Sequence, residues 1–134
     1  MERVVVVGLG KFGRALVETL AQRGADVLAI DRDMELVQEA ADSLPAVVQA
    51  DATDLEALRS AGVRGASAAV VAIGDDFQAA VLATSVLREL GVERITARAN
   101  SEREARILRL VGATEVVSIE QEMGRRLAIS LLGK

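Results

Sequence analysis

Residues 4–13 of the chain read Val-Val-Val-Val-Gly-Leu-Gly-Lys-Phe-Gly, and no other stretch constrains the fold as strongly. The four β-branched valines predict a strand buried on both faces. Gly8, Gly10 and Gly13 fit the pattern G-x-G-x-x-G. In that pattern the first glycine forms a tight turn, the second leaves room for phosphate oxygens, and the third lets the next helix pack on the strand. Unpaired amides at the start of that helix would face an anion.

An acidic residue follows at the spacing that a nucleotide site requires. Asp31 lies 18 residues beyond Gly13, directly after the apolar run 27–30, which predicts a second strand. A carboxylate at the end of that strand can accept hydrogen bonds from both hydroxyls of a ribose. Strand, glycine turn, helix, strand and acid in this order predict adenine-nucleotide binding. The alternative is a plain strand-to-helix turn, for which the placement of the acid would be a coincidence.

The composition narrows the class of protein. Apolar residues make up 51% of the 134 residues, and Phe12 and Phe77 are the only aromatic ones, so the core must consist of aliphatic side chains. Such a core suits a parallel sheet covered by helices. The net charge is −4, there is no basic block, and nucleic acid is therefore not an expected partner. The chain contains neither cysteine nor histidine, has no membrane-spanning run and begins without a signal peptide, which together predict a soluble, cytoplasmic protein.

Strand and helix patterns alternate six times along the chain. This predicts a Rossmann-like, doubly wound, six-stranded parallel sheet in a single α/β domain over residues 1–134, with strand order 3-2-1-4-5-6. The expected strands are Arg3–Val7, Asp26–Ile30, Ala46–Ala50, Ala68–Ile73, Arg94–Ala97 and Glu115–Ser118. The expected helices are Phe12–Arg23, Met34–Ser43, Asp54–Ala61, Asp76–Leu90, Glu102–Val111 and Glu120–Leu132.

Residues at the predicted strand ends are candidates for capping or binding. Asp75 is expected to cap the fourth helix, and three helix starts match the capping box: Thr53-x-x-Glu56, Ser101-x-x-Glu104 and Ser118-x-x-Gln121. Asp51, at the sheet edge, either accepts from the exocyclic amine of an adenine or favours a helix dipole. Arg98 either faces a polyphosphate or is a solvated charge. Lys11, inside the glycine turn, can reach a terminal phosphate.

Two predicted helices are unusually apolar. Residues 77–90 leave little polar face, so this helix either packs on the sheet or forms an interface between subunits. Residues 120–132 carry an apolar stripe near the end of the chain, for which an interface is the preferred interpretation.

These residues together resemble the nucleotide-binding N-terminal domain of the Ktr/Trk regulators, the RCK family, which controls potassium transporters and channels. The resemblance covers essentially all 134 residues. It rests on segments 7–13, 29–31, 50–54, 71–74, 78–80, 87–90, 98–100, 111–113 and 123–124.

The resemblance implies which residues hold the ligand. Glycine-turn residues Gly8, Leu9, Gly10, Lys11, Phe12 and Gly13 would meet the phosphates, and Asp31 and Arg32 the ribose end. Asp51, Ala52 and Thr53 would border the adenine, while Ile73, Gly74 and Arg98 would lie on the ribose-phosphate side. Glu120 matches an acidic position that in some relatives helps to place a cation at the subunit boundary.

The resemblance also implies a function. The chain would be a cytosolic regulatory subunit that binds ATP/ADP or NAD(H), assembles into at least a dimer and commonly an octameric ring, and gates a membrane potassium transporter.

NADP is disfavoured because Asp31 would repel its 2′-phosphate, an effect that Arg32 could soften. The alternative is an NAD-dependent oxidoreductase or a dinucleotide-binding fragment of one. Such an enzyme normally needs an acid or base such as the tyrosine and histidine that this chain lacks. The last helix would cross to a partner lobe. Family members carry a further C-terminal lobe, whereas this sequence stops at Lys134, as a shortened chain or a lobe that stands alone.

Overall fold

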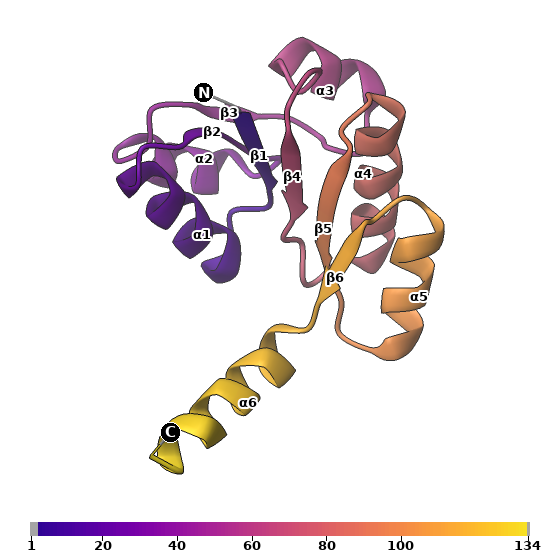
Figure 1. Ribbon diagram of the computed structural model, residues 1–134. Coiled ribbons are helices and arrows are strands. Elements are labelled where there is room, and N and C mark those ends of the chain that lie inside the picture. The colour runs from indigo at the N-terminus through magenta and orange to yellow at the C-terminus, as the bar shows by residue number, and fades with distance from the viewer. Residues whose placement is uncertain (1–2, 134) are drawn as a thin grey trace.

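A parallel six-stranded sheet forms the centre of the computed structural model, which describes residues 3–133 (Figure 1). Its order is β3-β2-β1-β4-β5-β6, as the sequence predicts. The strands are β1 (Arg3–Val7), β2 (Asp26–Asp31), β3 (Val47–Gln49), β4 (Ala68–Val71), β5 (Arg94–Arg98) and β6 (Glu115–Val117). Because Val7 pairs with both Ile30 and Val71, the carboxyl ends of three central strands lie level at one edge.

The helices cover both faces of this sheet, which makes the fold a doubly wound, Rossmann-like α/β domain. They are α1 (Lys11–Gln22), α2 (Met34–Ala41), α3 (Leu55–Ala61), α4 (Phe77–Glu89), α5 (Glu102–Leu110) and α6 (Ile119–Leu131). Val6 packs with α1 and α2, whereas Val5 and Val7 pack with α3, α4 and α5. Strand β1 is therefore buried on both faces, as its run of valines predicts.

Helix α4 packs on the sheet, so its apolar sequence has an explanation within the fold. Five of its residues are buried, and Leu82 is its one strongly exposed large apolar side chain. Among residues 3–133, no helix is both long enough and apolar enough to cross a membrane.

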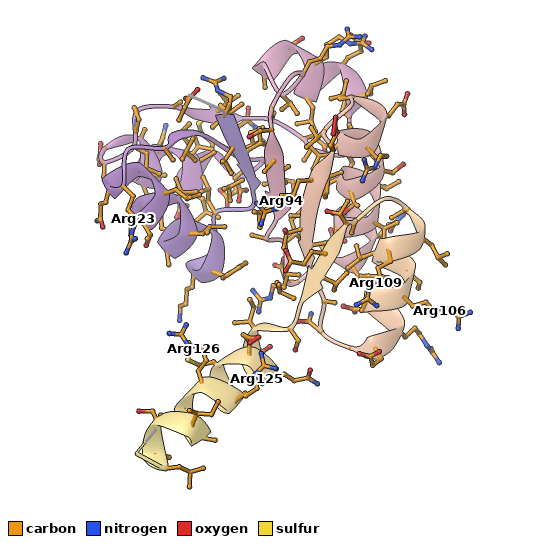
Figure 2. The ribbon with its side chains drawn as sticks, in the orientation of Figure 1. Arg23, Arg94, Arg106, Arg109, Arg125 and Arg126 are labelled. Carbon is orange, nitrogen blue, oxygen red and sulfur yellow. The ribbon has the colours of Figure 1, made fainter. Side chains whose placement is uncertain are left out.

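Helix α6 differs from the others because it projects away from the sheet and carries no buried residue (Figure 1). Its apolar side chains Met123, Leu127, Ile129 and Leu131 are all exposed. The arginines labelled in Figure 2 lie at the C-cap of α1 (Arg23), in β5 (Arg94), in α5 (Arg106 and Arg109) and in α6 (Arg125 and Arg126).

Three of the predicted helix starts are wrong in detail. The cap of α3 is Asp54, whose carboxylate accepts from two backbone amides, while the Thr53 hydroxyl donates to Asp51. The cap of α4 is Asp76, one residue beyond the predicted Asp75. Ser118 precedes α6 without a side-chain cap bond.

At α5 the predicted cap by Ser101 is confirmed, while the Glu104 carboxylate reaches back to the amide of Asn100 and not to that of Ser101 itself. The Ser101 hydroxyl accepts from the Glu104 amide at 3.1 Å, and the Glu104 carboxylate accepts from the Asn100 amide at 2.9 Å. At α3 and α4 the cap is instead the aspartate directly before the helix, because its carboxylate is the group that reaches the free amides.

Candidate functional site

The glycine turn brings the backbone of β1 into close contact with α1 and with the end of β4. Gly8 adopts φ +106°, which favours glycine, and a Cβ atom there would lie 3.1 Å from the Ile73 nitrogen. A Cβ atom on Gly13 would overlap the carbonyl oxygen of Gly8. Around Gly10, in contrast, there is open space. The first and third glycines are thus required by packing, and the second keeps a surface free.

Helix α1 begins at this turn with its amides available to an anion. Its N-cap is Gly10, which has no side chain to accept from them, and its first turn holds no acidic residue. By comparison, α2 and α4 are capped by Asp33 and Asp76. The partial positive charge of α1 is therefore directed at the open space beside Gly10.

Asp31 is held rigidly at the end of β2. Its Oδ2 accepts from the Leu9 amide at 2.8 Å, and its Oδ1 accepts from the Asp33 amide at 2.8 Å. Each carboxylate oxygen has a second acceptor position. The carboxylate is consequently oriented before any ligand arrives, with acceptor capacity to spare.

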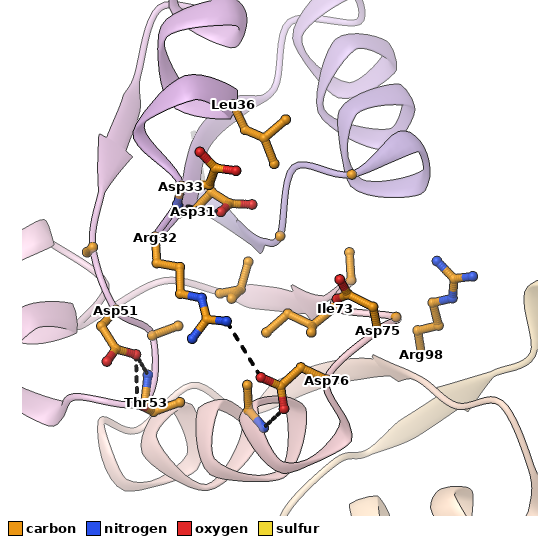
Figure 3. Close-up of a pocket in the computed structure, with 18 residues that line it drawn as sticks. Asp31, Arg32, Asp33, Leu36, Asp51, Thr53, Ile73, Asp75, Asp76 and Arg98 are labelled. Atoms are coloured by element: carbon orange, nitrogen blue, oxygen red, sulfur yellow. Dashed lines mark hydrogen bonds and ion pairs between the residues drawn. The ribbon is translucent and has the colours of Figure 1, made fainter.

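A cavity of about 500 Å³ opens between these groups at the carboxyl edge of the sheet (Figure 3). Ten of the predicted binding residues line it: Gly8, Gly10, Asp31, Arg32, Asp51, Ala52, Thr53, Ile73, Gly74 and Arg98. The ends of five strands, β1 to β5, or the loops after them thus converge on one hollow, the position at which open α/β sheets hold ligands.

Four predicted residues do not line the cavity. Leu9 is buried in the apolar cluster of the α1 face, against which Phe12 packs. Gly13 lies against the Gly8 carbonyl. Lys11 is exposed at the first position of α1. The side chain of Lys11 would have to reach from outside to meet a phosphate.

Several lining residues were missed from the sequence. Leu36, in the first turn of α2, and Ala79, in the first turn of α4, supply apolar surface; Asp33, Asp75 and Asp76 add carboxylates. Their positions in the sequence could have indicated them, because the first turn of a helix that follows a strand lies at the same sheet edge as the end of that strand.

Asp51 lies on the β3 side of the cavity, where it binds the neighbouring Thr53 (Figure 3). Its Oδ1 accepts from the Thr53 hydroxyl at 2.7 Å and from the Thr53 amide at 2.9 Å. These hydrogen bonds favour the charged form and lower the pKa of Asp51 below its ordinary value of 3.8, with a smaller contribution from Arg32. Asp51 is therefore an anion and a hydrogen-bond acceptor at neutral pH.

Arg98 lies on the other side of the cavity, where it also borders a second hollow of about 230 Å³. Its guanidinium carbon is 5.9 Å from the centre of the Phe12 ring, and its Nη2 is 3.7 Å from Glu120 of α6. Its Nε is buried and finds no hydrogen-bond partner within residues 3–133. Arg98 thus retains donors for an anion.

Glu120 has Arg98 as its ion-pair partner. Among the residues that the structure describes, no group of three or more carboxylates is placed to hold a metal ion. A cation at Glu120 stays a prediction.

The fold and the cavity define a Rossmann-like domain whose ligand site lies at the carboxyl edge of a parallel sheet. The model of the family described as the TrkA-N domain matches residues 4–119, and the chain belongs to that family. The family predicted from the sequence is confirmed.

Relatives carry potassium-uptake names. The chain is 36% identical over 95% of its length to the Ktr system potassium uptake protein C of Bacillus subtilis, and 34% identical over 99% to the Ktr system potassium uptake protein A of Vibrio alginolyticus. It spans 58% and 60% of the length of these two relatives.

Solved structures with the same fold include two whose names refer to a nucleotide. The first is the NAD(P)-binding domain of an exopolyphosphatase-related protein from Archaeoglobus fulgidus, with TM-score 0.87, 25% identity and full coverage of both chains. The second is GsuK bound to ADP, with TM-score 0.75 and 30% identity over 95% of this chain and 33% of that one.

Proposed function

We propose that this chain is the adenine-nucleotide-sensing domain of a potassium uptake system. The observation that carries the proposal is the cavity in which the rigid carboxylate of Asp31 and the free amide end of α1 face the same space. Those are the two groups that a ribose and a phosphate require. The potassium-uptake names of the relatives and the ADP complex of GsuK support it.

The chemistry of the cavity supports the following placement of the nucleotide. Phosphate oxygens would lie beside Gly10, within reach of the α1 amides, with Arg98 as a further donor. The ribose hydroxyls would donate to Asp31. The adenine would lie toward Asp51 and Leu36, where a carboxylate acceptor and apolar surface occur together.

Regulation rather than catalysis fits the groups present. Hydride transfer to or from NAD requires a positioned acid or base beside the substrate. The chain has neither tyrosine nor histidine, and four of the five carboxylates that line the cavity, Asp31, Asp33, Asp51 and Asp76, already accept hydrogen bonds from backbone amides. Sustained turnover of NAD with alcohols or hydroxy acids would identify an oxidoreductase instead.

The ligand is ATP/ADP or NAD(H) under this proposal, with NADP disfavoured. A 2′-phosphate would lie beside the Asp31 carboxylate, and like charges at close range repel. Under the same proposal, the domain lies in the cytoplasm, forms a homo-oligomer and passes its nucleotide state to an integral-membrane potassium transporter. The relatives' names support the link to potassium uptake.

One competition experiment tests the choice of ligand. ATP, ADP, NAD, NADH and NADPH would each displace a fluorescent ADP analogue from one protein sample. We expect displacement by the first four at lower concentrations than by NADPH. Equal affinities for NADH and NADPH would remove Asp31 from the ribose position, and no binding by any of the five would overturn the proposal.

A further inference from the structure

The candidate adenine pocket has no aromatic side chain. The two phenylalanines of the chain lie elsewhere, Phe12 in the apolar cluster of the α1 face and Phe77 beside the second hollow. Aliphatic groups such as Leu36 and Ile73 can cover one face of a flat base. The second face of the base also needs a side chain to pack on it, and in this cavity that side chain must be neither aromatic nor aliphatic.

Arg32 occupies the place from which such a cover would come. It follows Asp31 directly, and its side chain extends across the cavity toward α4 (Figure 3). There its Nη2 lies 3.7 Å from Oδ2 of Asp76. Asp76 is itself fixed, because its Oδ1 accepts from the Ala79 amide at 3.0 Å as the cap of α4. The pair thus joins the β2 side of the cavity to the α4 side.

This ion pair contributes little to folding. The Arg32 side chain is 70% exposed and that of Asp76 is 38% exposed, and exposed pairs of this kind are screened by water. A guanidinium is, however, a delocalised plane that stacks on aromatic rings while its edges continue to donate hydrogen bonds. Arg32 can therefore lie over a base and keep its contact with Asp76.

We propose that Arg32 is the base-covering residue of the adenine pocket and that Asp76 is the residue that positions it. The inference rests on the proposed function and deepens it, because it names how a site without aromatic residues recognises a purine. Arg32 acts here through its flat face and not as a phosphate contact, since phosphates would lie at the opposite end, beside Gly10.

The affinity series adenosine, AMP and ADP separates the two roles. Arg32→Ala is expected to weaken all three by the same factor of about tenfold, within the range of a desolvated cation–π contact. A loss that grows from adenosine to ADP would mean that Arg32 acts by charge on the phosphates, and would overturn the proposal. Arg32→Lys should lose as much as Arg32→Ala, whereas Arg32→Tyr, flat but uncharged, should recover most of the affinity. Full recovery by lysine alone would also contradict it.

Asp76→Asn tests the positioning role, because asparagine keeps the helix cap and removes the charge. We expect a smaller loss of ADP affinity than for Arg32→Ala, and no further loss when Asp76→Asn is added to Arg32→Ala. If Asp76→Asn weakened ADP binding by the same factor in the wild type and in Arg32→Ala, Asp76 would not act through Arg32, and its positioning role would be overturned.

Arg23→Ala is the matched control, since Arg23 ends α1 away from the cavity (Figure 2). Its ADP affinity should equal that of the wild type. Wild-type protein that binds no adenosine compound would overturn the proposed function together with this inference, whereas an unchanged Arg32→Ala variant would overturn the inference alone.

Discussion

At the scale of single residues, the site depends on side chains that are held in place before a ligand arrives. Asp31 illustrates this, because each of its carboxylate oxygens already accepts a hydrogen bond from a backbone amide, that of Leu9 or that of Asp33. The sequence predicts that this carboxylate lies at the end of the second strand. It does not predict that the glycine turn itself orients the carboxylate, because that bond joins segments 22 residues apart.

Replacing Asp31 by asparagine separates binding from folding. The amide oxygen can still accept from Leu9, while its NH₂ group would face the exposed Asp33 amide, so the loss of stability should be about 1 kcal/mol. Binding of ADP should weaken about tenfold or more, because hydrogen bonds to a charged group are lost. Calorimetry and urea unfolding measure the two effects. Asp42→Asn, at the exposed end of α2, is the control and should change neither.

The lowered pKa of Asp51 predicts a pH dependence of stability. Because its folded pKa lies below 3.8, the ionised carboxylate stabilises the folded state above the unfolded pKa, and this contribution is lost as pH falls through the folded pKa. Asp51→Asn should therefore be less stable than the wild type at pH 7, by a difference that is constant down to about pH 5 and shrinks below about pH 4. A difference that stays constant to pH 2 in urea unfolding would contradict this assignment.

At the scale of elements, the glycine turn and the helix caps show what local sequence can and cannot decide. The spacing of Gly8, Gly10 and Gly13 predicts the turn, and the structure gives each glycine a different surrounding. The caps of α3 and α4 were predicted one residue early. Two neighbouring residues could cap each helix, Thr53 or Asp54 for α3 and Asp75 or Asp76 for α4. The direction of the backbone decides which side-chain oxygen reaches the free amides, and the local sequence does not specify that direction.

Two alanine substitutions in the turn should have opposite effects. Gly13→Ala would force a methyl group into the Gly8 carbonyl, with an expected cost of about 3 kcal/mol or more. Gly10→Ala meets open space at φ −68°, so its cost should stay within about 1 kcal/mol, the scale of an altered helix cap. Its added methyl group would instead occupy the room for phosphate and weaken ADP. Urea unfolding and ADP titration of both variants check this, and unimpaired ADP binding by Gly10→Ala would place the phosphates elsewhere.

At the scale of the whole molecule, the strand order and both helical layers could be predicted because hydrophobic period and turn spacing determine them. The reach of Arg32 to Asp76 and of Arg98 to Glu120 could not, since each pair joins segments brought together only by the completed sheet. The apolar 77–90 helix packs on the sheet, whereas α6 remains exposed. Two helices with similarly apolar sequences thus differ in burial, because the chain topology lays α4 on the sheet and leaves α6 beyond it.

Self-association through α6 is the prediction that belongs to this scale. Leu127 and Leu131 lie one helical turn apart and are 57% and 79% exposed. Burying such side chains against a second copy is worth about 1.5–3 kcal/mol each. Sedimentation should therefore find at least a dimer, and Leu127→Glu with Leu131→Glu should give a monomer that still binds nucleotide. The control Gln121→Glu with Ser130→Glu adds the same charge at polar positions of α6; a wild-type monomer at high micromolar concentration would contradict the prediction.

Amide chemical-shift mapping during an ADP titration would show where on the domain the nucleotide binds. We expect saturable shifts concentrated in residues 8–13, 31–36, 51–53 and 72–79, the segments that form the glycine turn and line the cavity. Saturable shifts centred on α5 and β6 instead, or no saturable shifts in a folded sample, would contradict it.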